Sequence, residues 1–170
     1  MSTPPSAPDN TPHAVKGREE LAAARLQLLA GARYKLAIYL PSLTLDAFNS
    51  PAELAELRRI AVSGRGAEIR MILGDPAAAL RAGHRLIDLA QRLPSTLQIR
   101  TPTDQDEGEI KITRAWLLND TYGYLLLPDA ERMEGRSALR DGPGQAPLLL
   151  QFEQIWERAI PATQLQPLDL

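Results

Sequence analysis

The sequence predicts an α/β domain with a single mixed, mostly parallel sheet, flanking helices, a C-terminal antiparallel hairpin and a final helix. In the first part of the chain, short apolar runs alternate with amphipathic helical patterns, which is typical of parallel strands joined by helices. Further along, two apolar runs are separated only by residues 119–121, which predicts a hairpin. With 170 residues, 44% of them hydrophobic, the chain is long enough for one domain with a core.

The elements of the first part follow the hydrophobic pattern. They are, in order, a helix at 18–30, a strand at 35–40, a helix at 53–62, a strand at 67–73, a helix at 75–95 and a strand at 96–100. The first helix places Leu21, Ala24 and Leu28 on one face, and we expect it to end at Gly31. The first strand is a short apolar run closed by Pro41, which predicts a buried position.

Two of these helices begin with the same device, a capping side chain followed by proline. Ser50 is a predicted N-cap, Pro51 takes the first helical position and Glu53 completes a capping box. Asp75 and Pro76 repeat the cap and the proline at the start of the next helix.

The last part of the chain predicts the hairpin and the final helix. Its elements are an acidic loop at 101–108, strands at 112–118 and 122–127, a long loop at 129–147 and a helix at 148–160. We expect Trp116 to be buried against a helix, and Tyr122 and Tyr124 to share one face of the second strand.

Composition sets the domain limits and excludes several classes of function. Residues 1–14 are expected to be a disordered leader, 15–160 a single domain and 161–170 a tail. There is no cysteine, and a net charge of -2 argues against nucleic-acid binding. No secretory signal or membrane-spanning run is evident, so a cytoplasmic location is expected. No metal or cofactor motif is evident either.

The predicted helix at 75–95 concentrates the polar residues that can bind a ligand. Arg81, Arg85, Asp88 and Arg92 share one face, with His84 next to them. Aspartate four residues after histidine can stabilise an imidazolium, and arginines can hold an anion. The alternatives are a solvated face with weak ion pairs and a half-buried structural histidine.

The predicted topology adds two candidates to this group. In open α/β sheets, ligands bind beyond the carboxyl ends of the strands. Asp75 follows the strand at 67–73 and Arg100 ends the strand at 96–100, so both are candidate ligand-binding residues. Asp75 is also explained as a helix cap alone.

Part of this pattern resembles half of a phospholipase D-type domain. The matching elements are the strand at 36–40, the helix at 53–62, the Gly64-Arg65-Gly66 turn and the strand at 68–73. Active members of that superfamily carry H-x-K-x4-D, with histidine as the nucleophile. If Asp120 holds the aspartate position, Thr113 and Ala115 hold the histidine and lysine positions. Neither residue can form a phosphohistidine or balance its charge, so the resemblance implies the fold without the activity.

A closer resemblance is to an uncharacterised bacterial domain family with this degenerate fold, sometimes found downstream of a GNAT-type acetyltransferase. The matching segments are Gly83-His84-Arg85-Leu86, Arg92-Leu93-Pro94-Ser95, Ile99-Arg100, 125–129, Glu134-Gly135 and 152–158. No acetyltransferase module is present in this sequence. The family supplies no established activity.

Three functions follow from these observations. The first is a non-catalytic ligand-binding or regulatory domain whose His/Arg helix recognises an anionic small molecule or an acidic protein segment. The second is an interaction or homodimerisation module, which in this family would serve an acetyltransferase. The third is a divergent phosphodiesterase in which His84 and Asp88 supply relocated chemistry.

Overall fold

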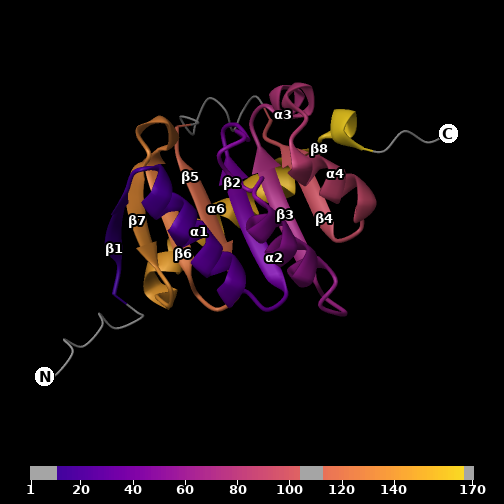
Figure 1. The fold of residues 1–170 in the computed structure, drawn as a ribbon. Helices are drawn as coiled ribbons and strands as arrows, with labels where there is room; N and C mark the ends of the chain where they lie inside the picture. Colours follow the sequence, from indigo (N-terminus) through magenta and orange to yellow (C-terminus); the bar gives the residue numbers. More distant parts are fainter. Residues whose placement is uncertain (1–10, 104–112, 167–170) are drawn as a thin grey trace, which may run out of the picture.

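The computed structural model describes residues 11–103 and 113–166, in which one sheet lies between two layers of helices (Figure 1). The strands are β1 (His13–Lys16), β2 (Lys35–Leu40), β3 (Glu68–Leu73), β4 (Leu97–Thr101), β5 (Ala115–Asn119), β6 (Tyr124–Asp129), β7 (Glu134–Ala138) and β8 (Ile160–Pro161). The α-helices are α1 (Arg18–Gly31), α2 (Pro51–Ala61), α3 (Pro76–Ala82), α4 (Arg85–Arg92) and α6 (Gly142–Arg158). Two short 3-10 helices are η1 (Ala130–Arg132) and η2 (Thr163–Leu165).

The sheet has eight strands in the order β1-β7-β6-β5-β2-β3-β4-β8. The prediction of one mixed sheet is confirmed, since Ile38 pairs with Met71 on one side and with Leu117 on the other. The prediction that the sheet is mostly parallel is wrong, because among the strand pairs of the described residues only β2–β3 and β3–β4 are parallel. Strands β5, β6 and β7 follow one another through short connections, which produce antiparallel pairs.

Both sheet edges extend into segments that were expected to lie outside the domain. Strand β1 starts at His13 and pairs antiparallel with β7. Strand β8 pairs with the end of β4, and beyond it Ala162 and Leu165 are buried. The described parts of the expected leader and tail therefore contribute to the fold, because each adds an edge strand. Both strands were missed because they are too short to be visible as a hydrophobic pattern.

The single helix predicted at 75–95 is wrong, because the chain folds there into α3 and α4. Gly83 ends α3 in the left-handed conformation, with φ 67°. His84 then has extended backbone, and its ring accepts a hydrogen bond from the Leu86 N–H as the N-cap of α4. Arg81 therefore lies on a different helix from Arg85, so the predicted continuous stripe is broken.

The predicted long loop at 129–147 is also wrong, since it contains η1, β7 and the first turns of α6. The Asp141 side chain caps α6 by accepting from the Gly144 N–H. Glycine and proline occupy the first turns of this helix, and these residues made it resemble a loop. Tyr122 lies outside β6 with φ 67° and is exposed, so it does not share a strand face with the buried Tyr124. Residues 104–108 of the predicted acidic loop lie outside the described residues.

Two apolar clusters hold the layers together. The larger one joins one face of the sheet to α1, α2, α3 and α4. The smaller one joins the other face to α6, and it includes Trp116, which is 1% exposed and packs with Phe152 and Trp156. The prediction that Trp116 is buried against a helix is confirmed.

Candidate functional site

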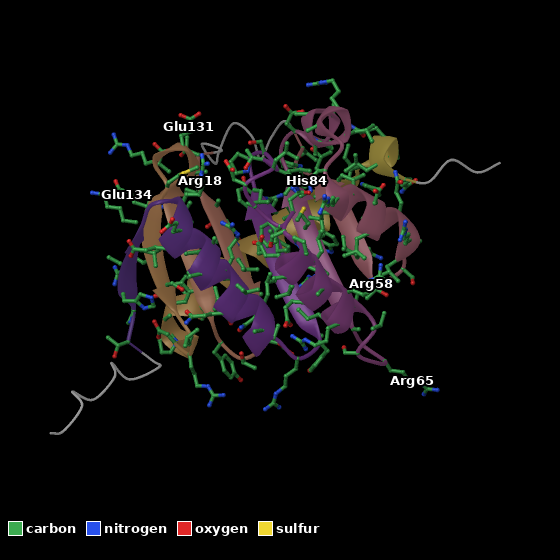
Figure 2. The ribbon with its side chains drawn as sticks, in the orientation of Figure 1. Arg18, Arg58, Arg65, His84, Glu131 and Glu134 are labelled. Atoms are coloured by element: carbon green, nitrogen blue, oxygen red, sulfur yellow. The ribbon has the colours of Figure 1, made fainter. Side chains whose placement is uncertain are left out.

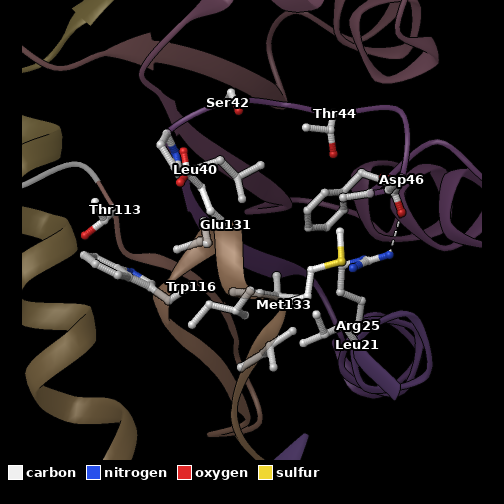
Figure 3. A pocket seen from close by; sticks show the side chains of 18 residues that line it. Leu21, Arg25, Leu40, Ser42, Thr44, Asp46, Thr113, Trp116, Glu131 and Met133 are labelled. Atoms are coloured by element: carbon white, nitrogen blue, oxygen red, sulfur yellow. Dashed lines mark hydrogen bonds between the residues drawn. The ribbon is translucent and has the colours of Figure 1, made fainter. Parts of the chain in front are cut away.

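A cleft of about 410 Å³ lies where β2 and β6 end and β5 begins, on the side of the sheet covered by α1 (Figure 3). It is lined by Leu21, Arg25, Leu40, Pro41, Ser42, Thr44, Asp46, Ala47, Phe48, Thr113, Ala115, Trp116, Leu117, Leu125, Leu127, Ala130, Glu131 and Met133. Most of these side chains are apolar. A concave, mainly apolar cavity with a few polar groups at its rim is typical of a small-molecule site.

The rim of the cleft offers hydroxyl groups and carboxylates but no unengaged cation among the lining residues. Asp46 and Glu131 contribute the carboxylates. Arg25 is the only lining cation, and its Nε lies 2.7 Å from Glu53 Oε1. Its Nη2 donates to the Asp46 carbonyl at 2.9 Å, which is the bond drawn in Figure 3. An anionic ligand would therefore meet carboxylates and an already neutralised guanidinium.

The structure separates the three residues that the resemblance assigns to a degenerate catalytic motif. Thr113 and Ala115 both line the cleft. Asp120 lies beyond the other end of β5, where its carboxylate accepts from the backbone N–H groups of Arg33 (2.8 Å) and Tyr34 (3.1 Å). Asp120 thus fastens the β5–β6 turn to the start of β2, whereas the two substituted positions lie in the cavity.

One wall of the cleft is the segment 44–48, and the buried Glu53 on α2 and the partly buried Arg25 on α1 hold its backbone. The Glu53 carboxylate accepts from the Phe48 N–H at 3.3 Å and from the Ser50 hydroxyl at 2.7 Å. Arg25, which pairs with Glu53, donates to the Asp46 carbonyl. Burial by itself raises the pKa of Glu53, but the hydrogen bonds from Arg25 and Ser50, with the charge of Arg25, hold it below its ordinary value. Glu53 is therefore a carboxylate at neutral pH.

His84 holds the same wall from the other side. Its Nε2 lies 3.0 Å from the Thr44 carbonyl and 2.8 Å from the Ala47 carbonyl, while its Nδ1 accepts from the Leu86 N–H at 3.1 Å. Carbonyls only accept and a backbone N–H only donates, so this arrangement assigns the neutral ring with its proton on Nε2. Burial lowers the pKa of His84, against the opposing effects of the two carbonyls and of the Glu53 charge.

The remaining predicted site residues do not form one site with His84. Arg85, Asp88 and Arg92 are exposed on α4, and none of them takes part in an ion pair within the described part of the chain. His84 is only 1% exposed and lies among the packed elements, whereas Arg65 projects outward (Figure 2).

The last two predicted residues have structural partners. The Asp75 side chain caps α3 by accepting from the Ala78 N–H. Arg100 donates to the Trp156 carbonyl at 2.7 Å and lies over the Trp156 ring, 4.1 Å from its centre. These contacts attach β4 to the end of α6, away from α4.

The cleft and two of the groups behind its wall were missed by sequence reasoning. Arg25 was not singled out within the predicted helix at 18–30, and Glu53 was interpreted only as a capping-box residue. The one available signal was the resemblance that assigned Thr113 and Ala115 to motif positions. Among the residues that the structure describes, no group of histidines and carboxylates could hold a metal ion. No helix in those residues combines the length and apolar character needed to cross a bilayer.

Solved structures with the same fold define the class of this domain. Nuc, a phospholipase D family member from Salmonella typhimurium, has a TM-score of 0.61 at 10% identity, covering 89% of this chain and 97% of Nuc. NucT from Helicobacter pylori has a TM-score of 0.60 at 14% identity, covering 89% and 98%. The expected likeness to the phospholipase D family is thus confirmed at the level of the fold.

A third structure with this fold is TrmBL2, an archaeal chromatin protein described as showing a novel mode of DNA binding. Its TM-score is 0.62 at 14% identity, over 89% of this chain. This chain spans only 54% of TrmBL2. At such identities, the three likenesses concern the fold alone.

The family itself is shown by the sequence comparison. The family model described as Domain of unknown function (DUF7931) matches residues 17–168, and the chain belongs to this family. No curated protein matches the chain.

Proposed function

We propose that this chain is a non-catalytic ligand-binding domain, and that its ligand is an uncharged, largely apolar small molecule bound in the cleft. One observation carries the proposal. Thr113 and Ala115, which the resemblance assigns to the positions of the missing histidine and lysine, line an apolar cavity of about 410 Å³. A cavity of this size, at the place where the fold's chemistry would stand, supports binding without reaction.

The absence of catalysis is supported by the state of the one ordered histidine near this region. His84 is 1% exposed, and both ring nitrogens have backbone partners. A phosphorus atom could not approach either nitrogen without unfolding the wall. This argues against the relocated phosphodiesterase in which His84 and Asp88 act together.

The apolar character of the ligand follows from the charges at the rim. An anion would have to be desolvated next to Asp46 and Glu131, and Arg25 is already paired with Glu53. A neutral molecule has no such cost and gains from burial against Leu40, Leu127 and the other apolar side chains.

Recognition of an anion by Arg85 and Arg92 remains a competing hypothesis. Both arginines are exposed and outside the cleft, so this mode predicts a weak, salt-sensitive contact. The expectations of a cytoplasmic location, of no nucleic-acid partner and of homodimerisation also stay predictions; the net charge of -2 supports the second of these.

The test is a fluorescence titration with two probes of similar size, neutral N-phenylnaphthylamine and anionic anilinonaphthalene sulfonate. We expect the neutral probe to bind, and Thr113→Trp to weaken it at least about tenfold, equivalent to about 1.4 kcal/mol. Thr113 is exposed at the rim, so the added ring blocks the cleft without disturbing the core.

The matched control is Thr163→Trp, which adds the same ring at an exposed position outside the cleft and should leave binding unchanged. Hydrolysis of bis(p-nitrophenyl) phosphate is measured in parallel, and no rate above background is expected. The proposal fails if the neutral probe does not bind, if binding is lost equally in both variants, or if hydrolysis is observed. Stronger binding of the anionic probe, lost in Arg85→Ala and Arg92→Ala, would support the competing hypothesis.

A further inference from the structure

We infer that His84 is a positioning residue for the cleft: it holds the wall at 44–48 in place only while its ring is neutral, so acidification opens the wall and releases the ligand. The release of ligand rests on the function proposed above. The opening of the wall does not, and it can be measured without a ligand.

The wall has no regular secondary structure that would hold it. Residues 44–48 lie in the connection between β2 and α2, and the structure gives this segment one internal backbone bond, from the Ala47 N–H to the Thr44 carbonyl. Its other fixed points are side chains of the surrounding helices. His84 engages the carbonyls of Thr44 and Ala47, the same two residues whose turn shapes the wall.

Protonation of His84 is incompatible with this set of contacts. The neutral ring donates from Nε2 and accepts at Nδ1, which matches two carbonyls on one side and the Leu86 N–H on the other. A proton on Nδ1 would bring two donors face to face at 3.1 Å. The charged ring must then rotate or leave its site, and the wall loses its bonds to α4.

The charged groups around His84 do not cancel this effect. The nearest carboxylate is Glu53 on α2, which favours the charged ring but is already neutralised by Arg25 on α1. Asp46 in the wall itself pairs with Arg18 at 3.5 Å, and Arg85 follows His84 on α4 as an exposed cation. Burial outweighs these influences and keeps the pKa of His84 below its ordinary value.

Opening of the wall would remove one side of the cleft. Thr44, Asp46, Ala47 and Phe48 all line it, and Phe48 is 1% exposed with φ 57°, a conformation that its neighbours must maintain. If the wall moves, the Phe48 ring leaves the cavity side, and the neutral ligand loses its contact surface there.

The variant His84→Asn separates the two roles of the residue. Asparagine is a strong helix N-cap, so it preserves the start of α4. Its shorter side chain cannot reach the carbonyls of Thr44 and Ala47 while it caps the helix. The control is His13→Asn, which removes the other histidine of the chain from an exposed position on β1.

The experiment measures amide hydrogen exchange of residues 44–48 and affinity for N-phenylnaphthylamine between about pH 7.5 and about pH 5, a range that brackets the ordinary histidine pKa. In the wild type and in His13→Asn we expect protection of 44–48 to fall with pH, after correction for intrinsic exchange rates, while β3 stays protected. Probe affinity should fall together with the protection of residues 44–48. In His84→Asn, protection and affinity should be low at every pH.

The inference is overturned if protection of residues 44–48 does not change with pH in the wild type, or if His84→Asn keeps wild-type protection. It is also overturned if the wall opens while probe affinity stays constant. Absence of probe binding at every pH, together with pH-dependent exchange of the wall, would instead refute the proposed function and retain the role of His84 in holding the wall.

Discussion

Two groups of charged and titratable residues lie close together in this fold but have different surroundings. The anchor residues Arg25, Glu53 and His84 stand behind the cleft wall, and each bonds to its backbone. The α4 stripe of Arg85, Asp88 and Arg92 faces solvent. The sequence pattern predicted a site at the stripe, whereas in the structure the anchor residues hold the cleft wall in place.

The difference teaches that the effect of a substitution on stability depends on the burial of the charged residue and not on how many charged residues lie near it. An exposed charged side chain on a helix is hydrated in both the folded and the unfolded chain, so its removal changes the free energy of unfolding little. A buried ion that has lost its partner keeps the cost of desolvation without compensation. The four predictions below sharpen this comparison, from the largest expected effect to the smallest.

Arg25→Met should have the largest effect, because it leaves the Glu53 carboxylate, 5% exposed, without its cation. We expect the free energy of unfolding in urea to fall by about 3 to 5 kcal/mol. The control Arg18→Met breaks the exposed pair with Asp46 and should cost less than about 0.5 kcal/mol. Equal losses in the two variants would contradict the distinction between anchors and surface charges.

Stability should decrease on acidification through His84. Burial lowers the folded-state pKa, so the unfolded chain takes up the proton first. The contribution of His84 is complete above the unfolded pKa of about 6.5 and is lost as the pH falls toward the lower folded value. Denaturation midpoints measured across this pH window test the prediction. The dependence of the midpoint on pH should vanish in His84→Asn and persist in His13→Asn. Glu53, whose pKa lies below its ordinary 4.5, titrates at lower pH and does not interfere.

Removal of the α2 cap should destabilise the protein more than removal of the exposed α3 cap. Ser50→Ala removes the cap of α2 and also the bond from its hydroxyl to Glu53, so we expect a loss of about 1 to 2 kcal/mol. Asp75→Ala removes only an exposed cap on α3 and should cost about 0.5 to 1 kcal/mol. Thermal unfolding of both variants gives the ranking, and a larger loss in Asp75→Ala would contradict it.

Arg85→Ala and Arg92→Ala should have the smallest effect. Both side chains are exposed and lack ion pairs among the described residues, so each change in unfolding free energy should stay within about 0.5 kcal/mol. Affinity for the neutral probe should also be unchanged. A loss of probe affinity in either variant would indicate that the binding site lies on α4 and not in the cleft.

Much of the fold could be predicted from the sequence because local patterns determine it. Apolar runs located β2 and β3, and the capping residues Ser50 and Asp75 marked the starts of two helices. The errors share a cause: β1, β8 and the start of α6 are defined by contacts that are distant in sequence or by Gly/Pro turns. The break at Gly83 depends on a single left-handed residue inside an otherwise helical pattern.

The site was predicted less well. His84 was identified by its type, but a sequence cannot show that a ring faces the carbonyls of Thr44 and Ala47, some 40 and 37 positions away. The resemblance to phospholipase D singled out Thr113 and Ala115 as motif positions, and both line the cleft, but it predicted neither the cleft nor its wall. The cleft is lined by residues of α1, of β2, β5 and β6 and of the connection after β2, and this arrangement is a tertiary property.

The most direct test of the central claim is an amide chemical-shift map of the ¹⁵N-labelled protein titrated with N-phenylnaphthylamine at neutral pH. The account predicts shifts concentrated at the amides of residues that line the cleft, such as Phe48, Ala115 and Leu127. Shifts concentrated on α4 at Arg85, Asp88 and Arg92, with the cleft amides unmoved, would contradict it.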